Sequence, residues 1–166
     1  METIILGIDP GSRCTGFGVI KNQPHQYQHI ASGVIRPPTR ESMSDRLHYI
    51  HQHIVSLIKD YKPQHMAIEK VFVSKNPAAA LKLGQSRSCA LIAAASTKLS
   101  VFEYSPRQIK QAVTGHGAAI KQQVQHMVTQ LLKLTHQPTE DAADALALAL
   151  CHAGIYTFSQ KIKGAS

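Results

Sequence analysis

Asp9 is the first residue in the chain with the setting of a catalytic or metal-binding group. It ends the apolar, isoleucine-rich run Thr3–Asp9, which predicts a strand buried on both faces, and Pro10-Gly11 then turns the chain. A carboxylate at the end of a buried strand is costly unless a cation or hydrogen-bond donors stabilise its charge. Two interpretations remain open here: Asp9 bonds the backbone of its own turn, or it belongs to a metal-binding carboxylate set.

Three further carboxylates could complete such a set. Glu69 ends a short apolar strand and so repeats the arrangement at Asp9. Asp141 and Asp144 are three residues apart on the helix expected from Thr139 to about Ala153, and they project to nearly the same side. An acid in the first turn also complements the helix dipole, which is a sufficient explanation for Asp141. It explains Asp144 less well, because Asp144 lies one turn deeper among apolar residues.

The elements that must position these acids follow from the hydrophobic patterning. The expected strands are 3–9, 15–20, 27–36, 65–69 and 101–104, and the expected helices are 39–61, 78–98, a short one opened by Ser105-Pro106, 118–134 and 139–153. A sheet with the first strand in the centre and the fourth beside it in parallel brings Asp9 and Glu69 to one edge. The sequence thus predicts an α/β fold with a five-stranded mixed sheet flanked by helices.

The composition limits the partners of the chain. Its 166 residues suffice for one domain, and its formal net charge of +8 favours a polyanion such as nucleic acid. No apolar run approaches the roughly 20 residues of a membrane span, so no membrane association is expected. The three cysteines are widely spaced without a C-x-x-C pair. That spacing argues against a disulfide framework or zinc site and for a reducing cytosol.

Four carboxylates that converge in a basic protein repel one another unless divalent cations lie among them. Hard oxygen ligands select Mg²⁺ or Mn²⁺ over zinc. Two such ions about 4 Å apart can activate a water and stabilise the leaving oxygen of a phosphodiester. Basic side chains around the acids would hold the phosphate backbone; candidates are Lys75, Lys82 and Arg87. The residues alone therefore favour metal-dependent phosphodiester hydrolysis.

Four separated motifs together resemble one family. The chain carries, in order, Gly7-Ile8-Asp9-Pro10-Gly11, Ala67-Ile68-Glu69 followed by Phe72, Leu81-Lys82-Leu83-Gly84-Gln85, and Asp141-Ala142-Ala143-Asp144-Ala145-Leu146-Ala147. These look like the bacterial RuvC Holliday-junction resolvases, with a likeness that runs from residue 3 to about 153. The resemblance implies an RNase H-like fold and Mg²⁺-dependent cleavage of two opposed strands of a four-way DNA junction, leaving 5′-phosphate and 3′-hydroxyl ends. We expect one nuclease domain over residues 1–157 and a flexible tail over 158–166.

The resemblance also implies roles for individual residues. The implied catalytic and metal-binding set is Asp9, Glu69, Asp141 and Asp144. Lys110 and Lys121 match family lysines near the scissile phosphate, where a cation could stabilise developing charge. Phe72 matches an aromatic that stacks on an unpaired base of the opened junction. Without the family, a Phe72 folded back on the core would be the preferred interpretation.

The partners implied by the resemblance are a second copy of the chain, the junction DNA, and the RuvA and RuvB branch-migration proteins of the bacterial cytoplasm. A two-fold dimer suits a substrate with two equivalent strands to cut. We expect the alanine-rich helix over 78–98 to supply much of the dimer interface, because its small residues allow close packing.

Three other functions fit parts of the pattern. An actin-like ATPase or sugar kinase also carries Asp-x-Gly after its first strand, but it needs two such domains. A related RNase H-like nuclease acts on RNA instead of junctions. A non-enzymatic junction-binding module is disfavoured by the acids, because carboxylates without a metal weaken DNA binding.

Overall fold

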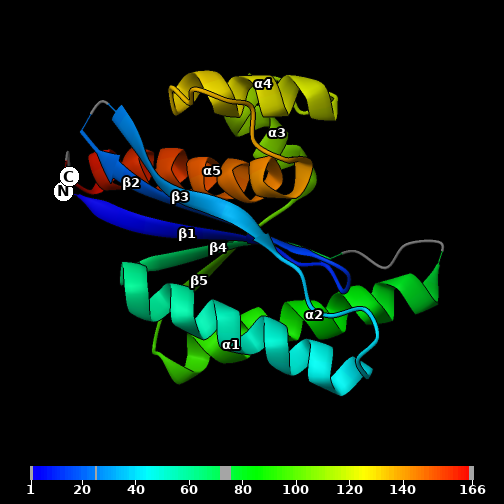
Figure 1. Cartoon of the computed structure of the whole chain (residues 1–166). Helices are drawn as coiled ribbons and strands as arrows, with labels where there is room; N and C mark the ends of the chain where they lie inside the picture. Colours follow the sequence, from blue (N-terminus) through cyan, green and yellow to red (C-terminus); the bar gives the residue numbers. More distant parts are fainter. Residues whose placement is uncertain (1, 25, 72–75, 165–166) are drawn as a thin grey trace.

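The computed structural model of the protein describes residues 2–24, 26–71 and 76–164. The described residues form one five-stranded sheet in the order β3-β2-β1-β4-β5, with helices on both faces (Figure 1). The strands are β1 Thr3–Asp9, β2 Thr15–Gln23, β3 Gln26–Ile35, β4 His65–Glu69 and β5 Ser100–Tyr104. The helices are α1 Met43–Tyr61, α2 Pro77–Ser96, α3 Pro106–Thr114, α4 Lys121–Leu131 and α5 Glu140–Gly164.

The sheet has the mixed topology that the sequence predicts. β1 pairs antiparallel with β2, and β2 pairs antiparallel with β3, which gives a three-stranded meander. On its other side β1 pairs in parallel with β4, with Ile8 opposite Ile68, and β4 pairs in parallel with β5. Because β1 and β4 run in the same direction, their carboxyl ends lie at one edge of the sheet.

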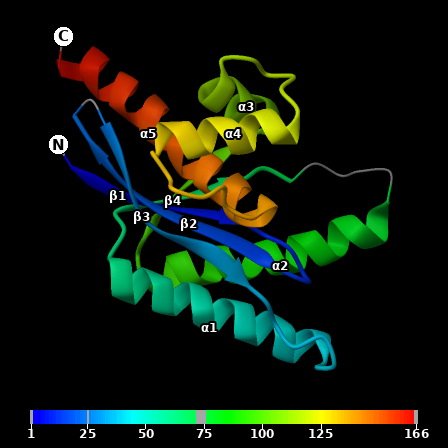
Figure 2. The same cartoon turned by 45° about the horizontal axis from the view of Figure 1, so that its top comes forward.

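Helices cover both faces of the sheet (Figures 1 and 2), and one cluster of buried hydrophobic residues lies on each face. Successive strand residues point to opposite faces. Ile5 belongs to the cluster that includes residues of α3, α4 and α5, whereas Leu6 belongs to the cluster that includes residues of α1 and α2. Both side chains are fully buried, and each such burial contributes about 1.5–3 kcal/mol of hydrophobic free energy. The stripe of α1 that enters its layer includes Ile50 and Ile54, as the helical spacing predicts.

Serine side chains cap two of the helices, and the start predicted at Ser105-Pro106 is confirmed. The side chain of Ser42 accepts a hydrogen bond from the backbone of Asp45 and caps α1, which begins at Met43, later than the expected Thr39. Ser105 caps α3 through a capping box with Gln108, and Pro106 occupies the first turn.

α5 is the central helix of the molecule and contacts β1 and β2 directly. This close approach depends on glycine: a Cβ added at Gly7 would lie 2.0 Å from the carbonyl oxygen of Ala145. Residues Glu140–Ile162 meet the length and hydropathy of a membrane span, but 61% of the apolar window is buried inside the protein. The apolar character of α5 is thus accounted for by its position in the core.

The predicted end of this last helix was wrong. α5 continues to Gly164 instead of ending near Ala153, so much of the segment 158–166, expected to be a tail, is helical. Thr157 anchors the extension, because its hydroxyl oxygen accepts a 3.0 Å hydrogen bond from the Asn22 side chain of β2. The glycine at 154 lies within the helix and does not end it.

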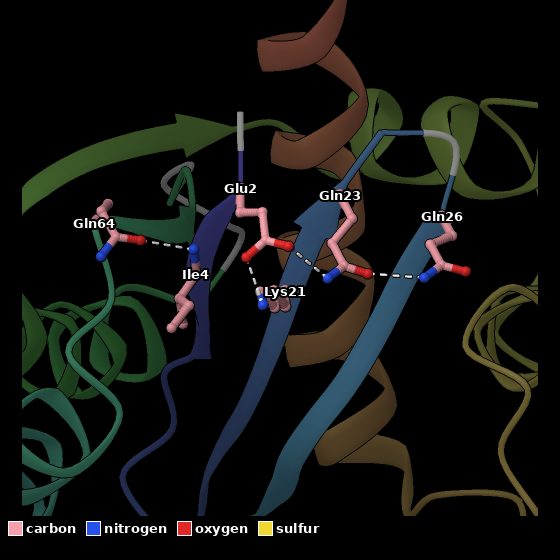
Figure 3. Close-up of polar contacts among 6 residues, drawn as sticks. All are labelled: Glu2, Ile4, Lys21, Gln23, Gln26 and Gln64. Carbon is pink, nitrogen blue, oxygen red and sulfur yellow. Dashed lines mark hydrogen bonds and ion pairs between the residues drawn. The ribbon is translucent and has the colours of Figure 1, made fainter.

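Polar side chains form a series of contacts at the end of the sheet where β1 begins. Figure 3 shows Gln64 accepting from the Ile4 backbone at 2.7 Å, and Glu2 pairing with the Lys21 ammonium. The chain of contacts continues from Glu2 to the amide of Gln23 and from there to Gln26 across the hairpin. These contacts fix the register of β1, whose opposite end carries Asp9.

Candidate active site

The parallel pair β1 and β4 places the first two predicted acids side by side. Asp9 is the last residue of β1 and Glu69 the last of β4, and each follows directly on the paired residues Ile8 and Ile68. Both acids are partly exposed at the sheet edge, although the residues directly before them, 5–8 in β1 and 66–68 in β4, are buried. The fold therefore supports both carboxylates on rigid backbone.

α5 brings two further acids to the same edge. A Cβ added at Gly16 of β2 would lie 2.0 Å from the backbone oxygen of Asp141, so the first turn of α5 rests directly on the sheet. Asp144 follows one turn later and is also partly exposed. Electrostatic coupling to Asp9 shows that these side chains lie near it. We call the four residues the acidic cluster: Asp9, Glu69, Asp141 and Asp144.

The electrostatics of the acidic cluster oppose ionisation. Burial raises the pKa of Asp9 to about 7, from a usual value of 3.8, and the charges of Asp144, Glu69 and Asp141 act in the same direction. Burial also raises the pKa of Glu69 and of Asp144. Lys121 opposes all three shifts. The cluster is thus short of positive charge.

The chemistry of the acidic cluster fits a divalent cation with a preference for oxygen ligands. Its donors are carboxylate oxygens, and a bound cation would relieve both their mutual repulsion and the cost of burying them. Over the described ranges, no three ligand side chains already form a group that could hold an ion.

Two of the predicted site residues, Lys110 and Lys121, lie near the acidic cluster. Lys121 at the start of α4 forms an ion pair with Glu140, and this hydrogen bond, more than the acidic cluster itself, raises the pKa of its ammonium group. Lys110 of α3 lies close enough to lower the pKa of Glu69 and Asp144. Their action on a phosphate held at the acids stays a prediction.

Cys14 is a neighbour of the acidic cluster that the sequence reasoning did not assign to it. Its thiol donates a 3.3 Å hydrogen bond to Asp141, 127 residues further along the chain. Burial, this hydrogen bond and the nearby carboxylates raise the pKa of the thiol, so Cys14 is a neutral donor. The nearby charge of Arg36 acts in the opposite direction and lowers the pKa of this thiol. No local sequence signal marks either residue.

The predicted DNA contact Arg87 has its guanidinium engaged inside the protein. Nη2 lies 2.6 Å from a carboxylate oxygen of Glu103 on β5, and Nε donates to the backbone oxygen of Glu69 at 3.3 Å. The Arg87 side chain is only 17% exposed. Arg87 thus ties α2 to the end of β4, while its predicted role as a DNA contact stays a prediction.

The remaining predicted DNA contacts lie on or before α2. Phe72 and Lys75 fall outside the described residues. Lys82 is exposed on α2, where it lines a groove together with Arg13 and Arg46. Its contact with DNA stays a prediction.

Comparison with known proteins decides the family. The model of the family described as crossover junction endodeoxyribonuclease RuvC matches residues 5–152. The chain belongs to the RuvC family. It is 57% identical over 150 residues to the RuvC of Tolumonas auensis, covering 90% of this chain and 86% of that protein. It is 52% identical to the RuvC of Colwellia psychrerythraea over 163 residues, covering 98% of this chain and 93% of that protein.

Solved RuvC structures share the fold. The RuvC of T. thermophilus in complex with a Holliday junction substrate superposes with a TM-score of 0.90 at 31% identity, covering 95% of this chain and 96% of that one. Another Thermus thermophilus RuvC structure gives a TM-score of 0.85, also at 31% identity, covering 94% and 96%. The expected RNase H-like fold is confirmed, and this RuvC protein is an endonuclease, a crossover junction endodeoxyribonuclease.

Proposed function

We propose that this RuvC protein resolves Holliday junctions by metal-dependent hydrolysis of two opposed DNA strands in recombination and repair. The observation that supports the proposal is the acidic cluster, where four carboxylates from three elements lie close enough to affect one another's ionisation, beside two lysines. The RuvC of T. thermophilus, which has been solved with a junction, supports the choice of substrate. The net charge of +8 supports a polyanionic partner as well.

Mg²⁺, with Mn²⁺ as a substitute, is the proposed cation of the acidic cluster; two ions per site would supply an activated water and stabilise the leaving oxygen. Asp9 must lose its proton before it can bind a cation, so the raised pKa makes binding proton-linked. Lys110 and Lys121 then stabilise the negative charge that develops on the phosphate. The products are nicks with 5′-phosphate and 3′-hydroxyl ends.

A homodimer is the proposed working unit, with α2 at its interface. Leu81 and Ile92 leave 68% and 59% of their surface exposed on this helix, and their spacing is close to three helical turns. A Cβ added at Gly84, between them, would meet nothing within 4 Å, so the helix surface is open to a neighbour. Isologous pairing places two identical acidic clusters on a two-fold symmetric junction.

The proposed cellular setting is the bacterial cytoplasm, with the branch-migration proteins RuvA and RuvB as partners. Membership of the RuvC family supports this proposal. The formal net charge of +8 supports DNA as a partner in that setting.

Cleavage of a synthetic four-way junction tests the proposed function. We expect paired nicks in opposed strands with Mg²⁺ and none with EDTA, mapped at nucleotide resolution. A linear duplex and a structured RNA of equal length are the controls. Equal rates on all three substrates would overturn the resolvase assignment, and cleavage in EDTA would overturn the metal dependence. Light scattering at working concentration tests the dimer, which a monomer would contradict.

A further inference from the structure

A basic groove lies beside the acidic cluster, between the loop that follows β1 and the first turns of α1 and α2. Its volume is about 470 Å³, and its lining includes Ser12, Arg13, Arg46, Asn76 and Lys82. Both cartoon views place the β1–β2 loop next to α2 (Figures 1 and 2). Three separate segments of the chain thus form its walls.

The charge of the groove is positive and uncompensated. Arg13, Arg46 and Lys82 line it, and none of the ion pairs among the described residues includes any of them. The neighbouring carboxylate of Asp45 is bound at 2.5 Å to the hydroxyl of Ser42 at the α1 cap. Cations held together without a counter-charge repel one another, and an anion in the groove removes that cost.

Arg46 holds one wall of the groove in place. Its Nη2 donates to the backbone oxygen of Ser12, which ties the β1–β2 loop to α1. Its Nε is buried, with no hydrogen-bond partner in the part of the chain that the structure describes. A wall fixed in this way gives a groove that exists before a ligand arrives, so binding costs little ordering.

The same loop connects the groove to the acidic cluster. Arg13 is exposed toward the groove, while the next residue, Cys14, donates its thiol to Asp141. A DNA strand carries one phosphate per about 3.4 Å of helix axis. A strand with one phosphate at the acids therefore has further phosphates within a short distance along its backbone.

We propose that the basic groove is a phosphate-binding subsite that holds the backbone of the junction strand beside the phosphate to be cut. Arg13 and Lys82 contact the DNA, and Arg46 acts as a positioning residue through Ser12. The guanidinium of Arg13 suits phosphate oxygens because it offers several donors in one plane. This inference rests on the proposed junction-cutting function and adds the surface that fixes the position of the strand.

Binding of a fluorescent four-way junction in EDTA, where no strand is cut, tests the subsite. We expect Arg13→Gln and Lys82→Gln each to weaken binding about tenfold at moderate salt and to lower the slope of log K against log salt by about 1. Lys59→Gln removes an exposed cation from the other end of α1 and is the matched control, with unchanged affinity and slope. Unchanged slopes in the two groove variants would overturn the proposal.

A second measurement identifies the phosphate that is bound. Phosphates flanking the cleavage position are replaced one at a time by neutral methylphosphonates, and binding is compared between the wild-type chain and the Arg13→Gln/Lys82→Gln double variant. At the phosphate held by the groove, the replacement weakens wild-type binding but leaves the variant unaffected. If the effects of the methylphosphonate and of the double variant add at every position, the groove is not the subsite. This holds even if the wild-type chain cuts the junction. A wild-type chain that cuts no junction would instead refute the proposed function.

Discussion

The thiol of Cys14 donates a hydrogen bond to a carboxylate oxygen of Asp141 over 3.3 Å. The contact joins the loop after the central strand to the first turn of the central helix, and so links two parts of the site from opposite ends of the chain. A donor to one oxygen of Asp141 limits the rotation of its carboxylate. Cys14 thus positions a predicted metal ligand without being one.

Removal of this donor should weaken metal use and leave junction binding intact. We expect Cys14→Ala to raise the Mg²⁺ concentration for half-maximal cleavage about three- to tenfold. A hydrogen bond to a charged group contributes about 1.5–3 kcal/mol, and a thiol is a weaker donor than that. Cys14→Ser retains a donor and should stay near the wild-type value. Measuring the cleavage rate against Mg²⁺ concentration gives the half-maximal concentration for each variant. Equal values for Cys14→Ala and Cys14→Ser would exclude the positioning role.

Asp9→Asn should abolish cleavage while junction binding survives or improves. The amide cannot supply the negative charge that the acidic cluster needs to hold a cation, and its neutrality removes repulsion toward phosphates. We expect a loss of at least about a thousandfold in the single-turnover rate. Asp60→Asn, an exposed acid on α1, is the matched control. Cleavage by Asp9→Asn at the wild-type rate would remove Asp9 from the site.

The raised pKa of Asp9 predicts how stability depends on pH in the absence of metal. Its folded value of about 7 lies above the usual 3.8, so the folded chain binds more protons than the unfolded chain between these values. The free energy of unfolding should therefore fall as the pH rises from about 4 to 7, by up to roughly 4 kcal/mol from this group. The full cost is present above pH 7.

Thermal denaturation in EDTA checks this sign. At pH 8 we expect Asp9→Asn to melt several degrees above the wild-type chain, because about 1 kcal/mol corresponds to roughly 2–4 °C at this size. At pH 4 the difference should nearly vanish. Added Mg²⁺ should raise the melting temperature of the wild-type chain more than that of the variant. Parallel pH profiles for the two proteins would contradict the assignment.

The contact between β1 and α5 allows no side chain at Gly7. A Cβ there would lie 2.0 Å from the oxygen of Ala145, so Gly7→Ala must push α5 away from the sheet. We expect a loss of about 1–3 kcal/mol in stability and a fall in cleavage, because Asp144 moves with the helix. Gly154→Ala is the control within α5, since its Cβ meets Tyr27 only at 3.9 Å. Chemical denaturation should show no loss for Gly154→Ala, which helix propensity favours.

The sequence was sufficient for those parts of the site that local pattern determines. Asp9 and Glu69 were located because apolar runs end at them, and parallel pairing then requires a common edge. The contact of Cys14 with Asp141 could not be predicted, because it depends on the exact position in which α5 packs against the sheet. The end of α5 was also missed, since Gly154 looks like a helix terminus until the packing of the extension is known.

Arg87 shows the same limit of sequence reasoning, because its type predicts a DNA contact and its surroundings favour a positioning role. The guanidinium joins Glu103 to the backbone oxygen of Glu69, so it holds the strand end that carries a predicted ligand. We expect Arg87→Gln to lower the cleavage rate at saturating junction about five- to tenfold, with unchanged junction affinity and salt dependence, and to cost about 1–2 kcal/mol in stability. Arg87→Lys keeps the charge but loses the second hydrogen bond. Its cleavage rate should therefore lie between that of the wild-type chain and that of Arg87→Gln. A salt slope lowered by about 1 in Arg87→Gln would show instead that Arg87 binds a phosphate.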